Sequence, residues 1–314
     1  MAKFRDSELD APSVLDAAPA RPAPPAARGD IDETATQDRS IGDIIRELRN
    51  LSAEQVESVL AYQREHGVRF GEAAVALKLV TTDDVMYALA QQFHYPYAPE
   101  ENRKDCPELV ALNQPFGVQA EAFRALRSQV IMRVWAEHAP RKALAVISAD
   151  HGDGKTFFAA NLAVSLAQLG GGRTLLVDAN LRGPRQHEVF GLDNHSGLSG
   201  ILSGRADKDV IQPVAGVPGL FVLGAGTTPP NPLELVERPA FGLLMRELAA
   251  KFDHVVVDTP AARSGADASV ISARCGAAIV VARKDESRVA ALQDLMASLD
   301  GTAVRLAGVV VNEL

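Results

Sequence analysis

The chain contains little cysteine and few aromatic residues. Two of its 314 residues are cysteines, and phenylalanine, tryptophan and tyrosine together account for 5%. Cys106 and Cys275 lie far apart and show no metal-ligand spacing, so we expect no cysteine-based metal site. Two thiols of this kind are typical of a protein in a reducing cytoplasm.

Long apolar runs and an excess of positive charge are also absent. No apolar stretch approaches the ~20 residues needed to span a bilayer, and the first eight residues lack the apolar core of a signal peptide. The formal net charge is −8, which argues against a generally basic surface for nucleic acid. We expect a soluble, cytoplasmic protein that binds no nucleic acid.

The apolar sequence that is present suffices for one substantial α/β core and a smaller second unit. Hydrophobic residues make up 47% of the chain. Residues 1–38 differ from the rest, because they hold nine alanines and five prolines and show no sustained periodicity. This composition predicts a disordered tail.

Residues 39–98 nearly repeat themselves at a spacing of 29 positions. The matching pairs are Gly42 and Gly71, Leu51 and Val80, Val56 and Val85, Leu60 and Leu89, and Gln63 and Gln92. Each copy predicts a short helix (Ile41 to Leu48, Gly71 to Leu77), a capping Ser52 or Thr81, and a second amphipathic helix. Such a repeat predicts two stacked helical units.

The repeat resembles the N-terminal domain of type II secretion and pilus ATPases, whose tandem motif in some members binds cyclic di-GMP. Arg69-Phe70-Gly71 matches the Arg-Leu-Gly opening of that motif, and Ser40-Ile41-Gly42 matches it in part. Arg49 and Lys78 replace its internal glycine. The resemblance implies cyclic di-GMP binding at residues 40–92, whereas the departures favour a protein-interaction module.

Residues 99–117 contain three prolines and mixed charges, which predicts a linker. A helix is expected to start near Gln119, and beyond it strands and helices alternate. The expected strands are Ala143 to Ile147, Thr174 to Asp178, Leu220 to Leu223, His254 to Asp258, Ala277 to Ala282 and Leu306 to Val311. This alternation over residues 118–314 predicts an α/β domain with a doubly wound, mostly parallel sheet that binds ligands at the carboxyl ends of its strands.

Residues 149–156, Ala-Asp-His-Gly-Asp-Gly-Lys-Thr, lie between the first expected strand and an amphipathic helical run. Backbone N–H groups at a glycine-containing helix start can surround a polyphosphate, so this segment predicts a P-loop for ATP. Lys155 would reach the β- and γ-phosphates, and the Thr156 hydroxyl would bind Mg²⁺. The predicted nucleotide-binding residues here are Gly152, Asp153, Gly154, Lys155, Thr156 and Phe157. We expect His151 to face solvent.

Two of the expected strands end in aspartate, at Asp178 and Asp258. Both strand ends should lie at the same sheet edge as the P-loop, where metal-assisted phosphoryl transfer needs carboxylates. One carboxylate would hold Mg²⁺ beside Thr156, and the other would orient the metal or accept a proton from the attacking group.

Several motifs, in order, resemble those of the bacterial tyrosine kinases, the autokinases of polysaccharide synthesis. Asp178-Ala-Asn-Leu-Arg182 is similar to the family's second Walker-type motif, and Glu121, Arg124 and Arg127 match its Glu-x-x-Arg-x-x-Arg oligomerisation helix. Further matches are Arg182-Gly-Pro184, Gly197-Leu198-Ser199, the run Pro229 to Leu235, and Asp258-Thr259-Pro260. The combination of these kinase motifs with a helical repeat domain is similar to that of the EpsG-type chain-length-determinant kinases.

The resemblance implies an ATP-dependent protein tyrosine autokinase that controls polymerisation and export of a surface polysaccharide. It further implies activation by a membrane-anchored chain-length regulator, which would recruit the kinase peripherally to the inner membrane. By the same resemblance Lys155 binds phosphates, Thr156 and Asp258 hold Mg²⁺, and Asp178 is the candidate base and a further metal-site residue. Asn312 would face the adenine or serve as a turn residue. Glu121, Arg124 and Arg127 would form a subunit interface in a homo-oligomer.

The chain departs from the family at two points. Members typically carry a tyrosine cluster in a C-terminal tail, but this chain has no tyrosine after Tyr97, which leaves Tyr95 and Tyr97 as candidate acceptors. Asn180 stands where the motif has its second aspartate, and an amide cannot act as a base. We therefore expect weakened chemistry.

Two other classes stay open. A cell-division or partition ATPase switch shares the fold, but those proteins usually carry a signature lysine where this chain has Asp150. A catalytically weak nucleotide-binding scaffold would fit the missing tail tyrosines. A Rossmann dehydrogenase is excluded, because no Gly-x-Gly-x-x-Gly follows the first strand.

Overall fold

The computed structural model describes residues 40–92, 106–136, 138, 140–205 and 210–313. The predicted tail at residues 1–38, the linker residues 99–105 and the candidate acceptors Tyr95 and Tyr97 lie outside the described residues.

The N-terminal described segment contains four helices: α1 (Ile41–Arg49), α2 (Ala53–His66), α3 (Phe70–Ala76) and α4 (Thr82–Gln92). Short and longer helices alternate, as the repeat predicts, around buried Ile45 and Val59. Each longer helix begins with a reciprocal cap. Ser52 exchanges hydrogen bonds with Gln55, and Thr81 exchanges them with Asp84.

The remaining elements build one seven-stranded sheet of order β3-β4-β2-β5-β1-β6-β7. Its strands are β1 (Ala143–Ile147), β2 (Thr174–Asp178), β3 (Ile211–Pro213), β4 (Leu220–Leu223), β5 (His254–Asp258), β6 (Gly276–Arg283) and β7 (Arg305–Asn312). All neighbours are parallel except β3 and β4. The mostly parallel P-loop fold is thus confirmed. The edge strand β3 was not predicted, because three residues that include a proline give no strand signal.

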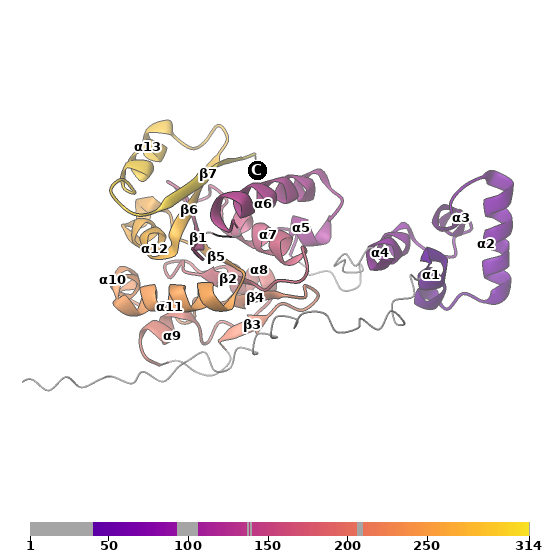
Figure 1. The fold of residues 1–314 in the computed structure, drawn as a ribbon, viewed down its shortest axis with the longest axis horizontal. Coiled ribbons are helices and arrows are strands. Elements are labelled where there is room, and N and C mark those ends of the chain that lie inside the picture. The colour runs from indigo at the N-terminus through magenta and orange to yellow at the C-terminus, as the bar shows by residue number, and fades with distance from the viewer. Residues whose placement is uncertain (1–39, 93–105, 137, 139, 206–209, 314) are drawn as a thin grey trace, which may run out of the picture.

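Helices cover both faces of this sheet (Figure 1). One face carries α5 (Val110–Asn113), α6 (Val118–Val134), α7 (Lys155–Ala167) and α8 (Gln186–Phe190). The other carries α9 (Leu198–Leu202), α10 (Pro232–Glu237), α11 (Pro239–Lys251), α12 (Asp267–Cys275) and α13 (Val289–Ala297). Within β1, Leu144 packs toward the first face and Ala145 toward the second, which explains why the strands are apolar throughout.

The central strands place their carboxyl ends together. β1 lies between β5 and β6, and β5 lies between β1 and β2. In this register Val146 pairs with Asp258, and Asp258 pairs in turn with Asp178. The loop that leaves β1 therefore starts next to both aspartates, at the edge where parallel sheets bind ligands.

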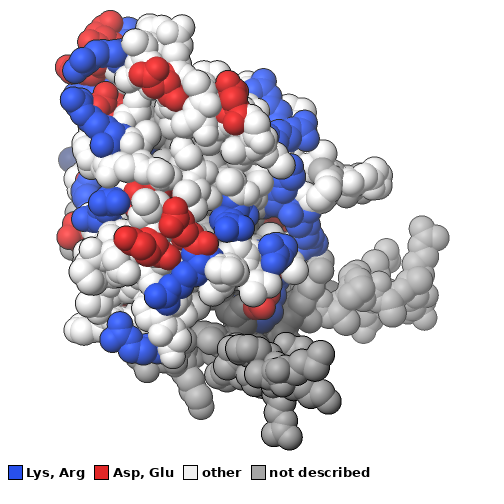
Figure 2. Space-filling model, turned by 90° about the vertical axis from the view of Figure 1, so that its left-hand side faces the viewer, with Lys and Arg blue, Asp and Glu red and all other residues white. Residues whose placement is uncertain are grey.

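None of the helices in the described part of the chain combines the length and the apolar character that a bilayer crossing requires. On the face shown in Figure 2, lysine and arginine side chains are interspersed with aspartate and glutamate.

Candidate active site

The P-loop connects β1 to α7 and depends on two glycines. Gly152 and Gly154 have φ angles of +83° and +95°, in the left-handed region that favours glycine. A Cβ atom on Gly154 would also lie 2.1 Å from Nδ2 of Asn312. The loop can hold this shape only with glycine at position 154.

Lys155 is buried at the start of α7, with 7% of its surface exposed. Its Nζ donates to Ser148 Oγ at 2.8 Å and to the Asp150 carbonyl at 3.4 Å. Burial lowers the pKa of Lys155, and the negative charges of Asp258 and Asp153 oppose that shift. The ammonium thus contacts neutral oxygens inside the loop, where a phosphate would supply the missing negative charge.

Asp153 and Asn312 fix the loop from inside. The buried Asp153 carboxyl accepts from the Asp150 N–H at 2.9 Å and from the Ser287 hydroxyl at 2.8 Å. Asn312, at the end of β7, donates from Nδ2 to the Asp153 carbonyl at 3.2 Å. Both side chains therefore support the loop. Asn312 is the last residue of β7.

Asp178 is fully buried and accepts three backbone hydrogen bonds. Its oxygens bind the N–H groups of Asn180 at 3.1 Å and of Arg185 and Gln186 at 3.0 Å each. Burial, followed by the nearby charge of Asp258, raises the pKa of Asp178 to about 8. A carboxyl with this pKa exchanges protons near neutral pH, which suits an acid or base.

Asp258 lies beside it and is also fully buried. Its Oδ2 accepts from Gln186 Nε2 at 2.9 Å, and its Oδ1 has no hydrogen-bond partner among the described residues. Burial raises the pKa of Asp258, while the neighbouring Thr156 hydroxyl, Gln186 and Lys155 act to lower it. Asp258 therefore presents one unpartnered oxygen next to the first turn of α7.

These residues fit Mg²⁺. The unpartnered Oδ1 of Asp258 and the Thr156 hydroxyl are hard oxygen donors next to the P-loop. The described residues hold no cluster of three or more His, Cys, Asp or Glu side chains that could bind a metal. Mg²⁺ needs none, because it commonly takes one or two protein ligands and completes its shell with phosphates and water.

Asn180 shapes the chain that follows β2. Its Nδ2 donates to the Gly183 carbonyl at 2.7 Å, and its Oδ1 accepts from the Gly183 N–H at 3.2 Å. An aspartate could accept from that N–H but could not donate to the carbonyl. The amide therefore closes the turn that returns the chain to Asp178.

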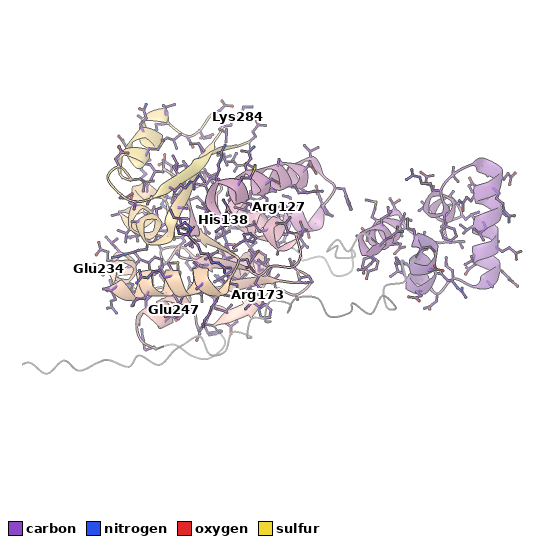
Figure 3. All side chains as sticks on the ribbon, viewed as in Figure 1. Arg127, His138, Arg173, Glu234, Glu247 and Lys284 are labelled. Carbon is purple, nitrogen blue, oxygen red and sulfur yellow. The ribbon has the colours of Figure 1, made fainter. Side chains whose placement is uncertain are left out.

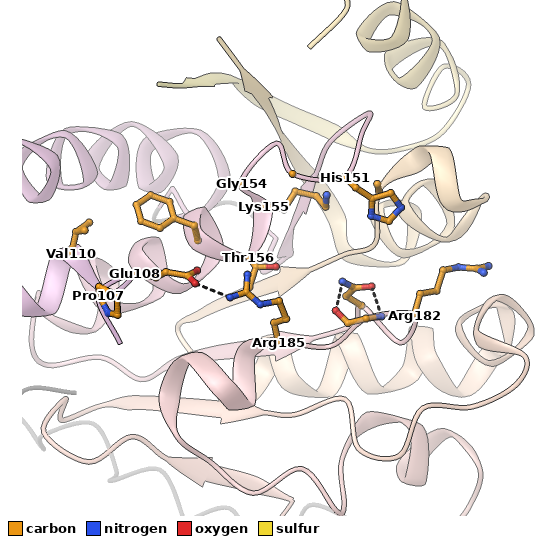
Figure 4. A pocket seen from close by; sticks show the side chains of 14 residues that line it. Pro107, Glu108, Val110, His151, Gly154, Lys155, Thr156, Arg182 and Arg185 are labelled. Carbon is orange, nitrogen blue, oxygen red and sulfur yellow. Dashed lines mark hydrogen bonds and ion pairs between the residues drawn. The ribbon is translucent and has the colours of Figure 1, made fainter. Parts of the chain in front are cut away.

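A pocket of about 580 Å³ opens over the P-loop (Figure 4). Pro107, Glu108 and Val110 line it on one side, and His151 and Arg182 line the other. Its remaining lining is Gly152, Gly154, Lys155, Thr156, Phe157, Asn180, Gly183, Arg185 and Ala261. The pocket therefore extends from the P-loop to the turn that follows β2.

Ion pairs and hydrogen bonds hold the pocket rim. Arg185 and Glu108 form an ion pair of 2.7 Å across one edge. His151 is exposed, and its Nε2 lies 2.8 Å from the Ser264 hydroxyl. Asp150, which stands where ATPase switches carry a lysine, pairs with Arg263 at 3.0 Å.

The predicted interface residues lie on α6, and both arginines contact their own chain. Arg124 donates to the Pro115 carbonyl at 2.8 and 2.5 Å and pairs with Glu121 at 3.2 Å. Arg127, labelled in Figure 3, donates to the Ser165 carbonyl in the last turn of α7 at 2.6 Å. Glu121 is the most exposed of the three.

Gln186 and the Glu108–Arg185 pair were not predicted from the sequence. Gln186 follows Asp178 by eight positions, a spacing that belongs to no motif, and the Glu108–Arg185 pair joins residues 77 positions apart. The turn residues Gly183 and Pro184 after the strand are the one local signal that the chain folds back.

Comparisons with known proteins agree with this geometry. A ParA family model, described as a NUBPL iron-transfer P-loop NTPase, matches residues 139–313. CapB of Staphylococcus aureus, named a tyrosine-protein kinase, is 33% identical over 205 residues, which cover 64% of this chain and 87% of CapB. The chain belongs to the bacterial tyrosine kinase family.

Longer relatives and solved structures extend this assignment. The tyrosine-protein kinase ptk of Acinetobacter johnsonii is 31% identical over 68% of this chain, which spans 29% of that relative's length. The kinase domain of the Escherichia coli tyrosine kinase ETK aligns with a TM-score of 0.62 at 30% identity, covering 68% of this chain and 82% of that one. The chimerical protein CapA2B2 aligns with a TM-score of 0.61 at 30% identity, covering 73% and 98%.

The buried carboxyl pair predicts a pH dependence of stability. Because the pKa of Asp178 is about 8 in the folded protein and near 4 when unfolded, unfolding between these pH values releases a proton. The stabilisation of the folded protein by the proton on Asp178 is fully present below about pH 4 and is lost as pH rises through about 8. Without Mg²⁺, denaturant titrations from pH 5 to 8 should show falling stability, by up to about 1.4 kcal/mol per pH unit for one proton.

Asp178→Asn supplies the control, since it removes the titrating group. Its stability should change less between pH 5 and 8 than that of the wild type, whatever its absolute value. Equal slopes in the two proteins would show that the proton released on unfolding is not held by Asp178.

Proposed function

We propose that this protein is an ATP-dependent protein tyrosine kinase that regulates the polymerisation and export of a surface polysaccharide. The observation that carries the proposal is the P-loop with Thr156 beside the unpartnered Oδ1 of Asp258, in a chain of the bacterial tyrosine kinase family. Positioning and charge neutralisation suffice for phosphoryl transfer, and this site offers both.

The residues would divide the work by position. Backbone N–H groups from Gly152 to Thr156 bind phosphate, and the Lys155 ammonium neutralises the charge that develops on it. Thr156 and Asp258 hold Mg²⁺, which supplies charge neutralisation when bound. Asp178 is the further carboxyl of the metal site, held by three backbone N–H groups, and in its ionised form it accepts the proton of the tyrosine hydroxyl.

The setting of the kinase is also a proposal. Residues 118–314 form the kinase domain, and residues 39–98 a protein-interaction domain, with cyclic di-GMP as an alternative ligand at residues 40–92. The predicted linker, residues 99–117, is corrected at its second half, because Leu109 and α5 are buried in the core of the kinase domain. A membrane-anchored chain-length regulator recruits the cytoplasmic kinase to the inner membrane. The family membership and the name of the CapA2B2 chimera support such an adaptor.

Oligomerisation through α6 can be tested directly. Changing Glu121, Arg124 and Arg127 together to alanine should lower the mass measured by light scattering. Because both arginines also bind carbonyls of their own chain, the control is Arg133→Ala, which removes a similar bond from α6 to the Ala307 carbonyl and leaves all three predicted interface residues in place. A wild-type mass for a folded triple variant would exclude the interface.

A second candidate function is an ATPase switch or a catalytically weak scaffold. The match to the ParA family model and the absence of any tyrosine after Tyr97 favour it. The ion pair of Asp150 with Arg263 opposes it, because the switch proteins usually carry a lysine at that position.

The deciding experiment incubates the protein with Mg·ATP, with and without the cytoplasmic segment of a candidate adaptor. Mass spectrometry then locates phosphotyrosine on every chain, with Tyr95 and Tyr97 as the candidate acceptors. Phosphotyrosine that Lys155→Ala eliminates supports the kinase. Phosphate release without modified tyrosine favours the ATPase switch. If neither phosphotyrosine nor free phosphate is formed, the result favours the scaffold.

A further inference from the structure

Gln186 joins three parts of the active site although it lies outside every recognised motif. It is completely buried at the first position of α8. Its side-chain Nε2 donates to Asp258 Oδ2 at 2.9 Å and to the Thr156 carbonyl at 3.2 Å. Its backbone N–H donates to Asp178 Oδ2 at 3.0 Å. One residue thus connects the ends of β2 and β5 with the first turn of α7.

The side-chain bonds determine which oxygen of Asp258 is available. Both hydrogens of the Gln186 amide have acceptors, which fixes the amide's orientation. Because Nε2 occupies Oδ2, the carboxyl cannot rotate freely, and Oδ1 is left without a partner among the described residues. Gln186 therefore orients the Asp258 carboxyl with Oδ1 free.

A second buried atom without a partner, Oε1 of Gln186, indicates which ligand the oriented Asp258 carboxyl binds. Gln186 Oε1 is also buried and has no hydrogen-bond partner among the described residues. Buried acceptors without donors are costly, and they usually bind water or a ligand. Hydrated Mg²⁺ fits both atoms, since it takes a carboxylate oxygen as ligand and keeps water molecules that can donate to an amide oxygen.

We propose that Gln186 is a positioning residue for the metal site. It holds Asp258 through Oδ2 so that Oδ1 faces the cation, and its Oε1 accepts a hydrogen bond from a metal-bound water. Mutating a residue that orients a metal ligand typically lowers metal affinity about 10- to 100-fold, and we expect an effect of this size for Gln186. The inference rests on the proposed Mg·nucleotide site and adds a residue to it.

The test measures ADP binding by calorimetry over a Mg²⁺ titration, in full-length wild type, Gln186→Met and Gln186→Asn. Methionine keeps the volume and removes the amide, whereas asparagine keeps the amide and withdraws it from Asp258. Both variants should need about 10- to 100-fold more Mg²⁺ for half of the metal-dependent gain in ADP affinity. Their ADP affinity in excess chelator should remain close to that of the wild type. The matched control is Gln293→Met, at an exposed position of α13.

The outcomes separate this inference from the proposed function. A wild-type Mg²⁺ requirement in either variant that still binds ADP in chelator overturns the role of Gln186. ADP binding by the wild type that does not respond to Mg²⁺ overturns the metal site itself. If methionine prevents folding, the asparagine variant decides, because it retains a polar side chain in the same chain position.

Discussion

Lys155→Ala is expected to reduce phosphate transfer to tyrosine by at least about 100-fold, the usual effect of removing one group that stabilises transition-state charge. The Lys155 ammonium is buried in the P-loop and donates to the oxygens of Ser148 and Asp150, so it already lies where the proposed site would bind phosphates. The measurement is initial-rate phosphotyrosine formation at saturating Mg·ATP.

The fold should survive this change. Ser148 Oγ keeps its own bond to the Asp150 carbonyl at 2.8 Å, and burial already disfavours the lysine charge that the variant removes. Thermal unfolding of Lys155→Ala should therefore resemble that of the wild type, and Lys155→Met is the control for lost volume. Unchanged turnover in either folded variant would refute the assignment of the P-loop as the catalytic site.

Asp258→Asn is expected to remove most of the dependence on Mg²⁺ together with at least about 100-fold of the transfer rate. Asparagine matches the shape of aspartate but carries no negative charge to attract the cation, and its NH₂ group is a donor where Oδ1 or Oδ2 must accept. The Nε2 group of Gln186 would then face either the oxygen or the NH₂ donor of the new asparagine amide. Rates measured over a Mg²⁺ titration report this loss.

A matched substitution tests whether the effect of Asp258→Asn comes from the position of this aspartate or from the loss of any buried carboxylate. Asp267 is also a buried aspartate, at the first position of α12, where Arg182 binds it at 3.0 and 3.1 Å. Asp267→Asn should leave the Mg²⁺ requirement unchanged, even if it weakens the contact of α12 with Arg182. A shift in the Mg²⁺ requirement of the same size in both variants would indicate a general effect on folding.

The sequence predicts the framework of this site well, because its signals are local. β1, β2, β4 and β5 form at their predicted residues, and the P-loop follows β1 where glycine and lysine spacing places it. A strand's apolar run and a loop's glycines can be recognised from adjacent residues, so predicting these elements requires no knowledge of tertiary contacts.

The rest of the site depends on contacts between distant residues. Gln186 reaches Asp258 across 72 positions, and the partner of Arg185 is Glu108, in a segment the sequence assigns to a linker. For Asn180 the sequence indicates a lost charge, while the structure shows that its amide closes a turn. Residue type alone cannot distinguish a missing catalytic group from a structural one.

The contact between Asn312 and the P-loop relates the site to the order in which the chain is made. Asp153 and Asn312 are 159 positions apart, so a ribosome finishes the loop long before the strand that supports it. Domains generally fold as units as synthesis proceeds from the N-terminus. The P-loop of a nascent chain therefore lacks the hydrogen bond to its Asp153 carbonyl until β7 joins the sheet, and nucleotide binding should be acquired late in biosynthesis.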